Sequence, residues 1–356
     1  MLTEKQIDEI REHLEKAQNP LFYYDNDADG LCSFVLLRRF SGRGKGVAVR
    51  SFPELNASYA KKAQELNADY VFVLDKPVLS REFVEEIAKL QLPLVWIDHH
   101  DVPREEFEKY FQNVFVYNPS RNRGKDKSEE PVTYLSYKIT GRKEDLWIAV
   151  MGCIADHFMP EIVSEFNEHY PEFWGKVKDP FDAYYKTEIG RIAMALNFGL
   201  KDSTTHIVQL QNFLISCKSP GDVLMENSFN YAFRKKHSEV KKKYDSLVGK
   251  AIEDVKGKLI FFEYGGELSI SSDISNELSY KYPEKYVVVA YKKGSVANIS
   301  LRGKNVRKIL ENVLKEVDGS GGGHEDAVGA RVKIDDLEKF KATLEREIVK
   351  YERDKN

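Results

Sequence analysis

Short apolar runs alternate with amphipathic helical patterns through the first hundred residues. The strand-like and helix-like segments alternate at residues 21–24, 31–41, 47–52, 55–67, 70–74, 80–91 and 93–97. This alternation is typical of βαβ units, which build a mainly parallel sheet with helices on both faces. The sequence therefore predicts a doubly wound α/β domain. In such domains ligands bind at the carboxyl ends of the strands.

The rest of the chain predicts a helical insert, a helical connector and a second domain. After Asp156 the pattern stays helical and rich in aromatic residues to about Lys218, without the alternation of a strand. A charged, helix-prone stretch follows, and strand-like runs return beyond Gly257. The predicted order is a first α/β domain at residues 1–225 with its helical insert near 157–218, a long connector at 226–257 and a smaller C-terminal α/β domain at 258–349.

The overall composition excludes several classes of protein. Lys and Arg number 54 against 57 Asp and Glu, and the net charge of −3 gives no global attraction to nucleic acid or to an anionic membrane. No apolar stretch reaches the roughly 20 residues that span a bilayer, and the first ten residues lack the apolar segment of a signal peptide. We therefore expect a cytoplasmic protein without a membrane partner.

The cysteine pattern argues against a disulfide framework and against a zinc finger. The chain has only Cys32, Cys153 and Cys217, an odd number without CxxC spacing. We expect all three thiols to be buried in or near the core.

Acidic and imidazole side chains follow the ends of the predicted strands. Asp25, Asp27 and Asp29 follow the first strand, Asp75 the third, Asp98, His99 and His100 the fourth, and Asp156 follows a helix predicted at 144–155. So many acids at one sheet edge repel one another unless cations lie between them. Carboxylates and imidazoles without a thiolate suit Mn²⁺ or Mg²⁺. Two such ions, bridged by a carboxylate, can activate water and stabilise the leaving oxygen of a phosphoryl group.

Each motif also has a simpler explanation. The DxDxDG stretch resembles a Ca²⁺ loop, but the acidic ligand expected six residues after its glycine is replaced by Leu36. Asp75 alone could cap a helix, and the pair His99 and His100 could lie on the surface. The occurrence of all these residues at successive strand ends favours one shared site.

At these motifs the chain resembles the DHH family of phosphoesterases, which includes RecJ exonucleases, oligonucleotide and pAp phosphatases and manganese pyrophosphatases. The motif order and spacing are most similar to those of archaeal RecJ-like proteins. The matching stretches are residues 25–30 (DNDADG), 73–75 (VLD), 98–100 (DHH), 152–156 (GCIAD), and, for the family's C-terminal domain, 300–303 (SLRG) and 321–330 (GGGHEDAVGA). The resemblance thus covers nearly the whole chain.

The resemblance implies a role for each residue of the first domain. The implied roles are one metal held by Asp27, the other by Asp29, His99 and Asp156, a bridge between them at Asp75, an orienting carboxylate at Asp98 and a group facing the scissile phosphate at His100. Tyr23 stands where many relatives carry a histidine. A neutral phenol is a poorer metal ligand than imidazole. Asp25 is therefore the candidate for the missing ligand of the first metal ion.

The second domain carries candidates for holding the substrate. They are Arg302, Gly321, Gly322, Gly323 and His324. The glycines would form a loop at 318–323 whose N–H groups converge on an anion, and a helix starting near Glu325 would add its positive end. Arg302 can donate two hydrogen bonds to a phosphate. We expect the substrate to bind between these donors and the metals.

The function predicted from these residues is a metal-dependent exonuclease that hydrolyses single-stranded DNA or RNA to mononucleotides with two Mn²⁺ or Mg²⁺ ions. A shorter substrate site would make it a phosphatase of short oligonucleotides or pAp. Tyr23 motivates a third possibility, an inactive RecJ-like replication scaffold. The predicted partners are single-stranded nucleic acid and a helicase or replisome protein. The candidates for binding the nucleic-acid backbone are Arg121, Arg123, Lys125 and residues 234–236.

Overall fold

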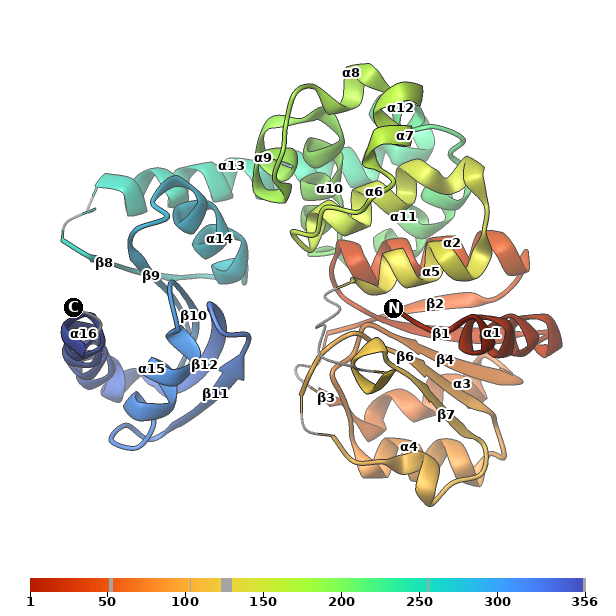
Figure 1. Ribbon diagram of the computed structural model, residues 1–356, viewed down its shortest axis with the longest axis horizontal. Coiled ribbons are helices and arrows are strands. Elements are labelled where there is room, and N and C mark those ends of the chain that lie inside the picture. The colour runs from red at the N-terminus through yellow and green to blue at the C-terminus, as the bar shows by residue number, and fades with distance from the viewer. Residues whose placement is uncertain (51–53, 103, 123–129, 254, 256, 355–356) are drawn as a thin grey trace. The chain divides into compact units, whose positions relative to one another are not determined.

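Residues Met1–His237 form the first of two units and are built around a parallel five-stranded sheet (Figure 1). The structure is a computed structural model that describes residues 1–50, 54–102, 104–122, 130–253, 255 and 257–354. The second unit comprises Ser238–Asn356, and the division falls within helix α13 (Tyr231–Glu253). Within the described residues no helix combines the length and the apolar character that crossing a membrane requires.

The strand order of the first sheet is β2-β1-β4-β6-β7, and every pairing is parallel. The strands are β1 (Pro20–Asp25), β2 (Lys45–Val49), β4 (Tyr70–Leu74), β6 (Leu94–Ile97) and β7 (Val114–Tyr117), and the short strands β3 (Glu54–Leu55) and β5 (Val78–Leu79) pair separately. The order reverses direction between β1 and β4. Doubly wound sheets bind their ligands at this kind of switch point, outside the carboxyl ends of the strands.

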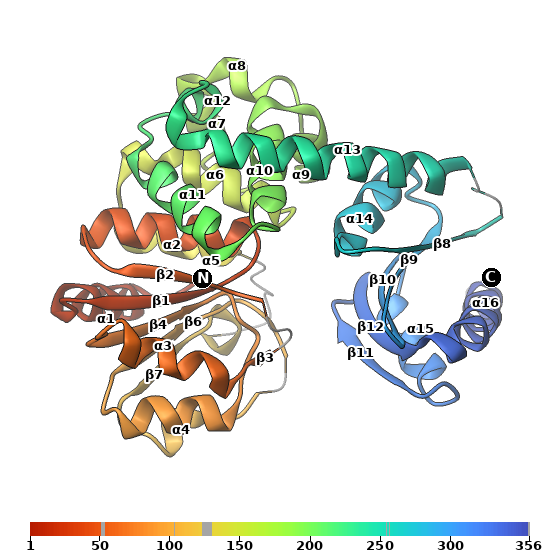
Figure 2. The ribbon, with the colours of Figure 1, turned by 180° about the vertical axis from the view of Figure 1, so that it is seen from behind.

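Helices cover both faces of this sheet, which confirms the predicted fold class (Figures 1 and 2). The helices before the insert are α1 (Glu4–Lys16), α2 (Ala28–Ser41), α3 (Ala60–Glu65), α4 (Arg81–Lys89), α5 (Val132–Thr140) and α6 (Leu146–Ala155). Side chains alternate along β1, so Phe22 and Tyr24 join the core with α2, α5 and α6, while Tyr23 joins the core with α3 and α4. Both faces of β1 are therefore buried.

The region from Asp156 to Lys218 is helical, as the sequence predicts. Its helices are α7 (Val163–His169), α8 (Pro171–Trp174), α9 (Pro180–Lys186), α10 (Glu188–Gly199) and α11 (Thr204–Ser216), and α12 (Pro220–Leu224) follows. Their apolar side chains extend the core that contains Phe22 and Tyr24. Cys32, Cys153 and Cys217 are free and buried, as expected from the sequence.

The second unit contains a mixed five-stranded sheet of order β11-β12-β10-β9-β8, parallel only between β8 and β9. Its elements are β8 (Leu259–Gly265), α14 (Ser271–Lys281), β9 (Tyr286–Lys293), β10 (Val296–Arg302), α15 (Val306–Val313), β11 (Gly319–Gly323), β12 (Ala327–Lys333) and α16 (Leu337–Asp354). Helices α15 and α16 pack on one face and bury Val288, Ile299 and Leu301. A smaller α/β domain is thus confirmed in this part of the chain.

Two expectations about the glycine-rich segment are wrong. Residues 319–323 form the edge strand β11 rather than a loop, because their backbone pairs with β12. Gly321 lies opposite Ala330, and a Cβ at Gly321 would come within 2.9 Å of the Ala330 Cβ. No helix starts near Glu325, because the His324 N–H donates to the carbonyl of Ala327 at 2.9 Å and closes a turn into β12.

Close packing of three helices depends on a glycine in α6. A Cβ at Gly152 would lie 2.3 Å from Thr133 Oγ1 and 2.8 Å from the Cβ of Cys32. Thr133 lies on α5 and Cys32 on α2, so the absence of a side chain at Gly152 lets all three helices meet. The same approach brings Asp29 on α2 toward Asp156 at the end of α6.

We predict that Gly152→Ala lowers the free energy of unfolding of the first unit by about 1–3 kcal/mol, the usual cost of overpacking a core. Trp96, Trp147 and Trp174 all lie in this unit, so urea unfolding followed by tryptophan fluorescence measures the effect. Gly221→Ala on α12 is the matched control, because its Cβ would be no closer than 3.5 Å to any neighbour. Equal stabilities of the two variants would contradict this account of the packing.

Candidate metal centre

The turn from β1 into α2 places the first acids. Asp27 is the N-cap of α2, and its Oδ1 accepts a hydrogen bond from the Gly30 N–H at 2.9 Å. A Cβ at Gly30 would lie 2.4 Å from the carbonyl oxygen of Asp25, so this turn needs a glycine. The tight turn keeps Asp25, Asp27 and the buried Asp29 close together at the end of β1.

Asp29 joins α2 to the N-terminus of α5. Its Oδ1 accepts from the Thr133 N–H at 2.7 Å and its Oδ2 from the Val132 N–H at 3.0 Å. The Thr133 hydroxyl donates to the Asp29 carbonyl at 2.9 Å. Backbone N–H groups at a helix start favour an anion, so α5 fixes the orientation of this carboxylate.

Asp75 lies at the centre of the cluster in an unusual backbone conformation. Its φ is 59°, a left-handed value that side-chain-bearing residues rarely adopt. The carboxylate is buried, and its Oδ1 accepts no hydrogen bond from the described residues. This oxygen lies 3.4 Å from His99 Nε2 and 3.9 Å from His100 Nδ1. A buried oxygen without a donor is costly, and a bound cation would remove that cost.

Asp98 holds His100 and is itself held by basic and amide groups. Its Oδ1 lies 2.7 Å from His100 Nδ1, and its Oδ2 lies 2.8 Å from Arg104 Nη1 and 3.1 Å from Asn118 Nδ2. Burial alone would raise the pKa of Asp98, but the nearby His100 and Arg104 lower it below its usual value. Asp98 in turn raises the pKa of His100 to about 9, although burial opposes this change.

The structure brings all the predicted metal-binding residues together. Three sets have potential ligand atoms within 4.8 Å of one another, namely Asp25, Asp27 and Asp75; Asp29, His99 and Asp156; and Asp75, His99 and His100. Asp75 is shared by the first and third sets and His99 by the second and third. The geometry therefore fits divalent cations bound by oxygen and imidazole, and the role of each residue as a ligand stays a prediction.

The carboxylates of this cluster disfavour one another's ionised forms. Burial, followed by the charges of Asp25 and Asp29, raises the pKa of Asp27 to about 7. Burial and the neighbouring carboxylates also raise the pKa of Asp75 well above its usual value. Burial and the neighbouring negative charges thus both disfavour the ionised carboxylates, and positive ions would relieve this cost.

Tyr23 takes no part in this cluster. Its hydroxyl donates to the carbonyl of Tyr59 at 2.7 Å, and its ring packs against Tyr59 and Phe83. A lysine missed by the sequence analysis lies beside the acids instead. Lys76 Nζ is 2.8 Å from Asp25 Oδ1, and its side chain is 0% exposed. The available signal was the position of this lysine directly after Asp75.

Sequence analysis also missed residues that support the site from a distance along the chain. Arg104 and Asn118 hold Asp98, and Thr133 holds Asp29. None of the three belongs to a motif that ends a strand with an acid. Their role depends on tertiary contacts, so spacing alone gives no signal for them.

The predicted substrate-binding residues meet in the second unit. Arg302 ends β10, and Gly321, Gly322 and Gly323 lie in β11, which the turn at His324 connects to β12. The Gly303 N–H donates to the Asp326 carbonyl at 3.1 Å and joins this turn to the end of β10. Arg302 Nε donates to Asn276 Oδ1 at 2.6 Å. Phosphate binding by these residues stays a prediction.

Two of the basic residues predicted to bind nucleic acid form ion pairs within the protein. Arg121 pairs with Glu108, and Arg234 pairs with Glu226. Arg123 and Lys125 lie outside the described residues. The ion pairs of Arg121 and Arg234 account for these two side chains without a ligand.

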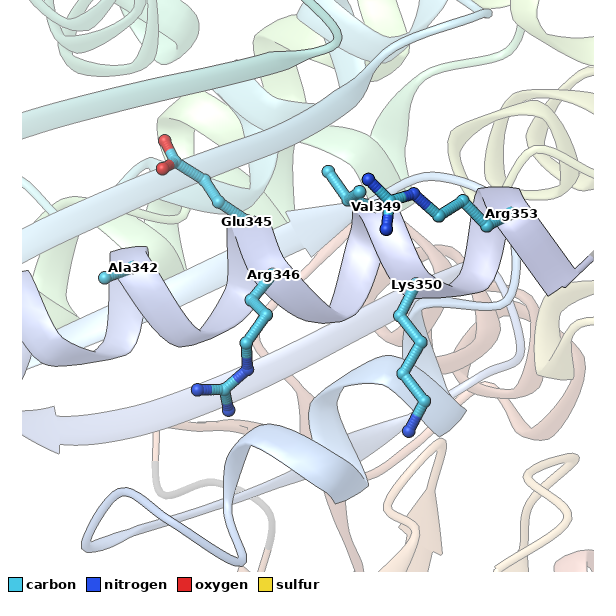
Figure 3. A pocket seen from close by; sticks show the side chains of 6 residues that line it. All are labelled: Ala342, Glu345, Arg346, Val349, Lys350 and Arg353. Atoms are coloured by element: carbon cyan, nitrogen blue, oxygen red, sulfur yellow. The ribbon is translucent and has the colours of Figure 1, made fainter.

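An open depression of about 640 Å³ lies along the exposed side of α16 (Figure 3). It is lined by Ala342, Glu345, Arg346, Val349, Lys350 and Arg353. All six project from a single helix, and Arg346 also pairs with Glu316. None of these lining residues is a predicted site residue. The acid cluster is therefore the candidate functional site.

Comparison with known protein families gives two matches. The N-terminal domain of the DHH family matches residues 21–149, and the DHHA1 domain matches residues 254–350. No curated protein matches the chain.

Several solved structures share the fold at low sequence identity. RecJ from Thermus thermophilus in complex with Mn²⁺ has a TM-score of 0.69 and 14% identity, over 98% of this chain and 56% of that one. A DHH domain from a member of the S1p family of ribosomal proteins has a TM-score of 0.68 and 14% identity, over 97% and 90%. CDC45 from Entamoeba histolytica has a TM-score of 0.53 and 11% identity, over 97% and 99%.

The present chain thus spans a little more than half of the Thermus RecJ, and these identities establish the fold alone. The closer likeness to archaeal RecJ-like proteins stays a prediction. The chain has two domain matches, it shares its fold with other DHH proteins, and its DHH motifs form an acid cluster. These findings show that the chain belongs to the DHH family of phosphoesterases.

Proposed function

We propose that this chain is a metal-dependent exonuclease that hydrolyses the phosphodiester bonds of single-stranded DNA or RNA and releases mononucleotides. The observation that supports it is the convergence of acids and imidazoles around the buried Asp75 at the switch point of the sheet. These side chains fit Mn²⁺ or Mg²⁺. When bound, such ions provide positive charge to the phosphate and lower the pKa of water.

The residues of the cluster divide into binding and orienting groups. Asp29, His99 and Asp156 would hold one cation, and Asp25 and Asp27 would bind positive charge at a second position, with Asp75 between the two. Asp98 fixes His100 through its Nδ1 at 2.7 Å, so the imidazole can meet a substrate phosphate in one orientation. Arg302, the glycines of β11 and His324 would bind a phosphate group at the second unit.

The choice of a polymeric substrate has support from the comparisons. A second RecJ structure, described as an exonuclease bound to manganese, has a TM-score of 0.63 and 14% identity and covers 97% of this chain. The phosphatase alternative needs the same chemistry with a shorter substrate. The scaffold alternative is favoured by the fold shared with CDC45 and by the orientation of Tyr23, whose hydroxyl binds the Tyr59 carbonyl. A helicase or another replisome protein stays a predicted partner.

We predict that Asp75→Asn lowers Mn²⁺-dependent hydrolysis of a labelled oligonucleotide by at least about a hundredfold, because it removes the shared carboxylate of the metal centre. Asp8→Asn on the exposed face of α1 is the matched control and should retain full activity, because exposed ion pairs such as Asp8 with Arg11 contribute little. Equal activity of the two variants would contradict the proposed centre.

Mn²⁺ should also stabilise the fold. At a concentration 100 times its dissociation constant, a bound ion adds about 2.7 kcal/mol to the free energy of unfolding, which raises the melting temperature by several degrees. Asp156→Asn should reduce this shift, because Asp156 is part of a metal set and is partly exposed. Thermal unfolding with Mn²⁺ and with EDTA measures it. The absence of any shift at millimolar Mn²⁺ would favour the scaffold.

Substrate length separates the two enzyme functions. The exonuclease should degrade a 20-nucleotide strand at least about tenfold more efficiently than a dinucleotide, because additional phosphates contribute binding energy outside the reacting group. The ratio of kcat/KM for the two substrates measures this preference. A preference for the dinucleotide would support the phosphatase instead.

A further inference from the structure

Lys76 is a fully buried lysine inside the acidic cluster. Its Nζ lies 2.8 Å from Asp25 Oδ1, and the side chain is 0% exposed. Ligand atoms of Asp25, Asp27 and Asp75 lie within 4.8 Å of one another, so the ammonium is bound at the edge of this set. Lysine is almost never fully buried unless its charge is paired. The acids therefore explain how Lys76 can be buried.

The backbone at Asp75 helps to bring two consecutive side chains to the cluster. In an extended strand, residues 75 and 76 would point to opposite faces of the sheet. β4 ends at Leu74, and the positive φ of Asp75 breaks the alternation there. The Lys76 carbonyl accepts from Trp96 Nε1 at 2.8 Å, which fixes the backbone of the lysine against β6.

We propose that the Lys76 ammonium takes the place of one of the two cations, so that the chain binds a single divalent ion next to a built-in positive charge. The inference rests on the proposed function, since it concerns the same centre. Lys76 is a positioning residue. It neutralises Asp25 and thereby makes the net charge of the ligands Asp25, Asp27 and Asp75 less negative.

The position of the ammonium beside Asp25 supports this inference. An ion held by Asp25, Asp27 and Asp75 would need to approach a carboxylate oxygen of Asp25 to about 2.1 Å, and the ammonium already lies 2.8 Å from Asp25 Oδ1. The ion and the ammonium would then lie only about 4 Å apart. Even with the dielectric constant of water, a double and a single charge at that distance lower the affinity on the order of thirtyfold, and more in a buried site.

A second set of ligands does not include Asp25. Asp29, His99 and Asp156 form it, and its described ion pair is between His99 and Asp156, with 3.9 Å between Nε2 and Oδ2. A neutral imidazole binds a metal ion instead of repelling it. Asp156 is 40% exposed, so an ion can reach this set from solvent. The single divalent ion is therefore assigned to Asp29, His99 and Asp156.

The experiment counts the bound ions. Isothermal titration of the full chain with Mn²⁺ should give one ion per chain, and electron paramagnetic resonance should show the six-line spectrum of an isolated Mn²⁺. Lys76→Met retains the apolar part of the side chain and removes the charge. This variant should bind two ions and show the spectrum of a spin-coupled pair. Lys89→Met, which changes an exposed lysine of α4, should bind one ion like the wild type.

Each result decides between the inference and its alternatives. Two coupled ions in the wild type, or one ion in a folded Lys76→Met variant, would overturn the role of Lys76 and leave the proposed function intact. No binding at millimolar Mn²⁺ would overturn both. Tryptophan fluorescence checks that the variant folds. If it does not fold, the ion count of the wild type still decides, and Lys76→Arg, which keeps the charge, should bind one ion.

Discussion

Repulsion between buried carboxylates is the constraint on which the centre of the first unit depends. Asp27, Asp29 and Asp75 have raised pKa values, first because they are buried and, for Asp27 and Asp75, also because other carboxylates lie close by. The fold holds them together in spite of this cost. Backbone N–H groups at the start of α5 bind Asp29, and a left-handed backbone conformation directs Asp75. Positive charge close to these carboxylates would relieve the cost.

The fold was predictable where local patterns and tertiary structure agree. β4 covers residues 70–74, which the alternating pattern predicts as a strand. The agreement fails at β11. Its GSGGG sequence has little strand propensity, and only pairing with β12 makes it a strand. A local pattern contains no information about such a partner.

The acids of the site were predictable because the carboxyl ends of parallel strands meet at one edge of a sheet. That argument identifies Asp25, Asp75 and His99 from their positions alone. It does not identify what lies between them. Lys76 reaches the cluster only because the chain leaves the β conformation at Asp75, and a φ of 59° in an aspartate cannot be derived from the residue type.

The described contacts show how the protein distributes its own positive charge among these acids. Asp98 is paired with Arg104 and His100, and Asp25 is paired with Lys76, so each of these two carboxylates has a basic side chain within 2.8 Å. Asp75 is different, since its nearest described basic groups are imidazole nitrogens at 3.4 Å and 3.9 Å. Its buried Oδ1 accepts no hydrogen bond from the described residues. The protein therefore neutralises the periphery of the cluster itself, and a divalent ion held by Asp29, His99 and Asp156, as proposed above, would supply positive charge to the rest of the cluster.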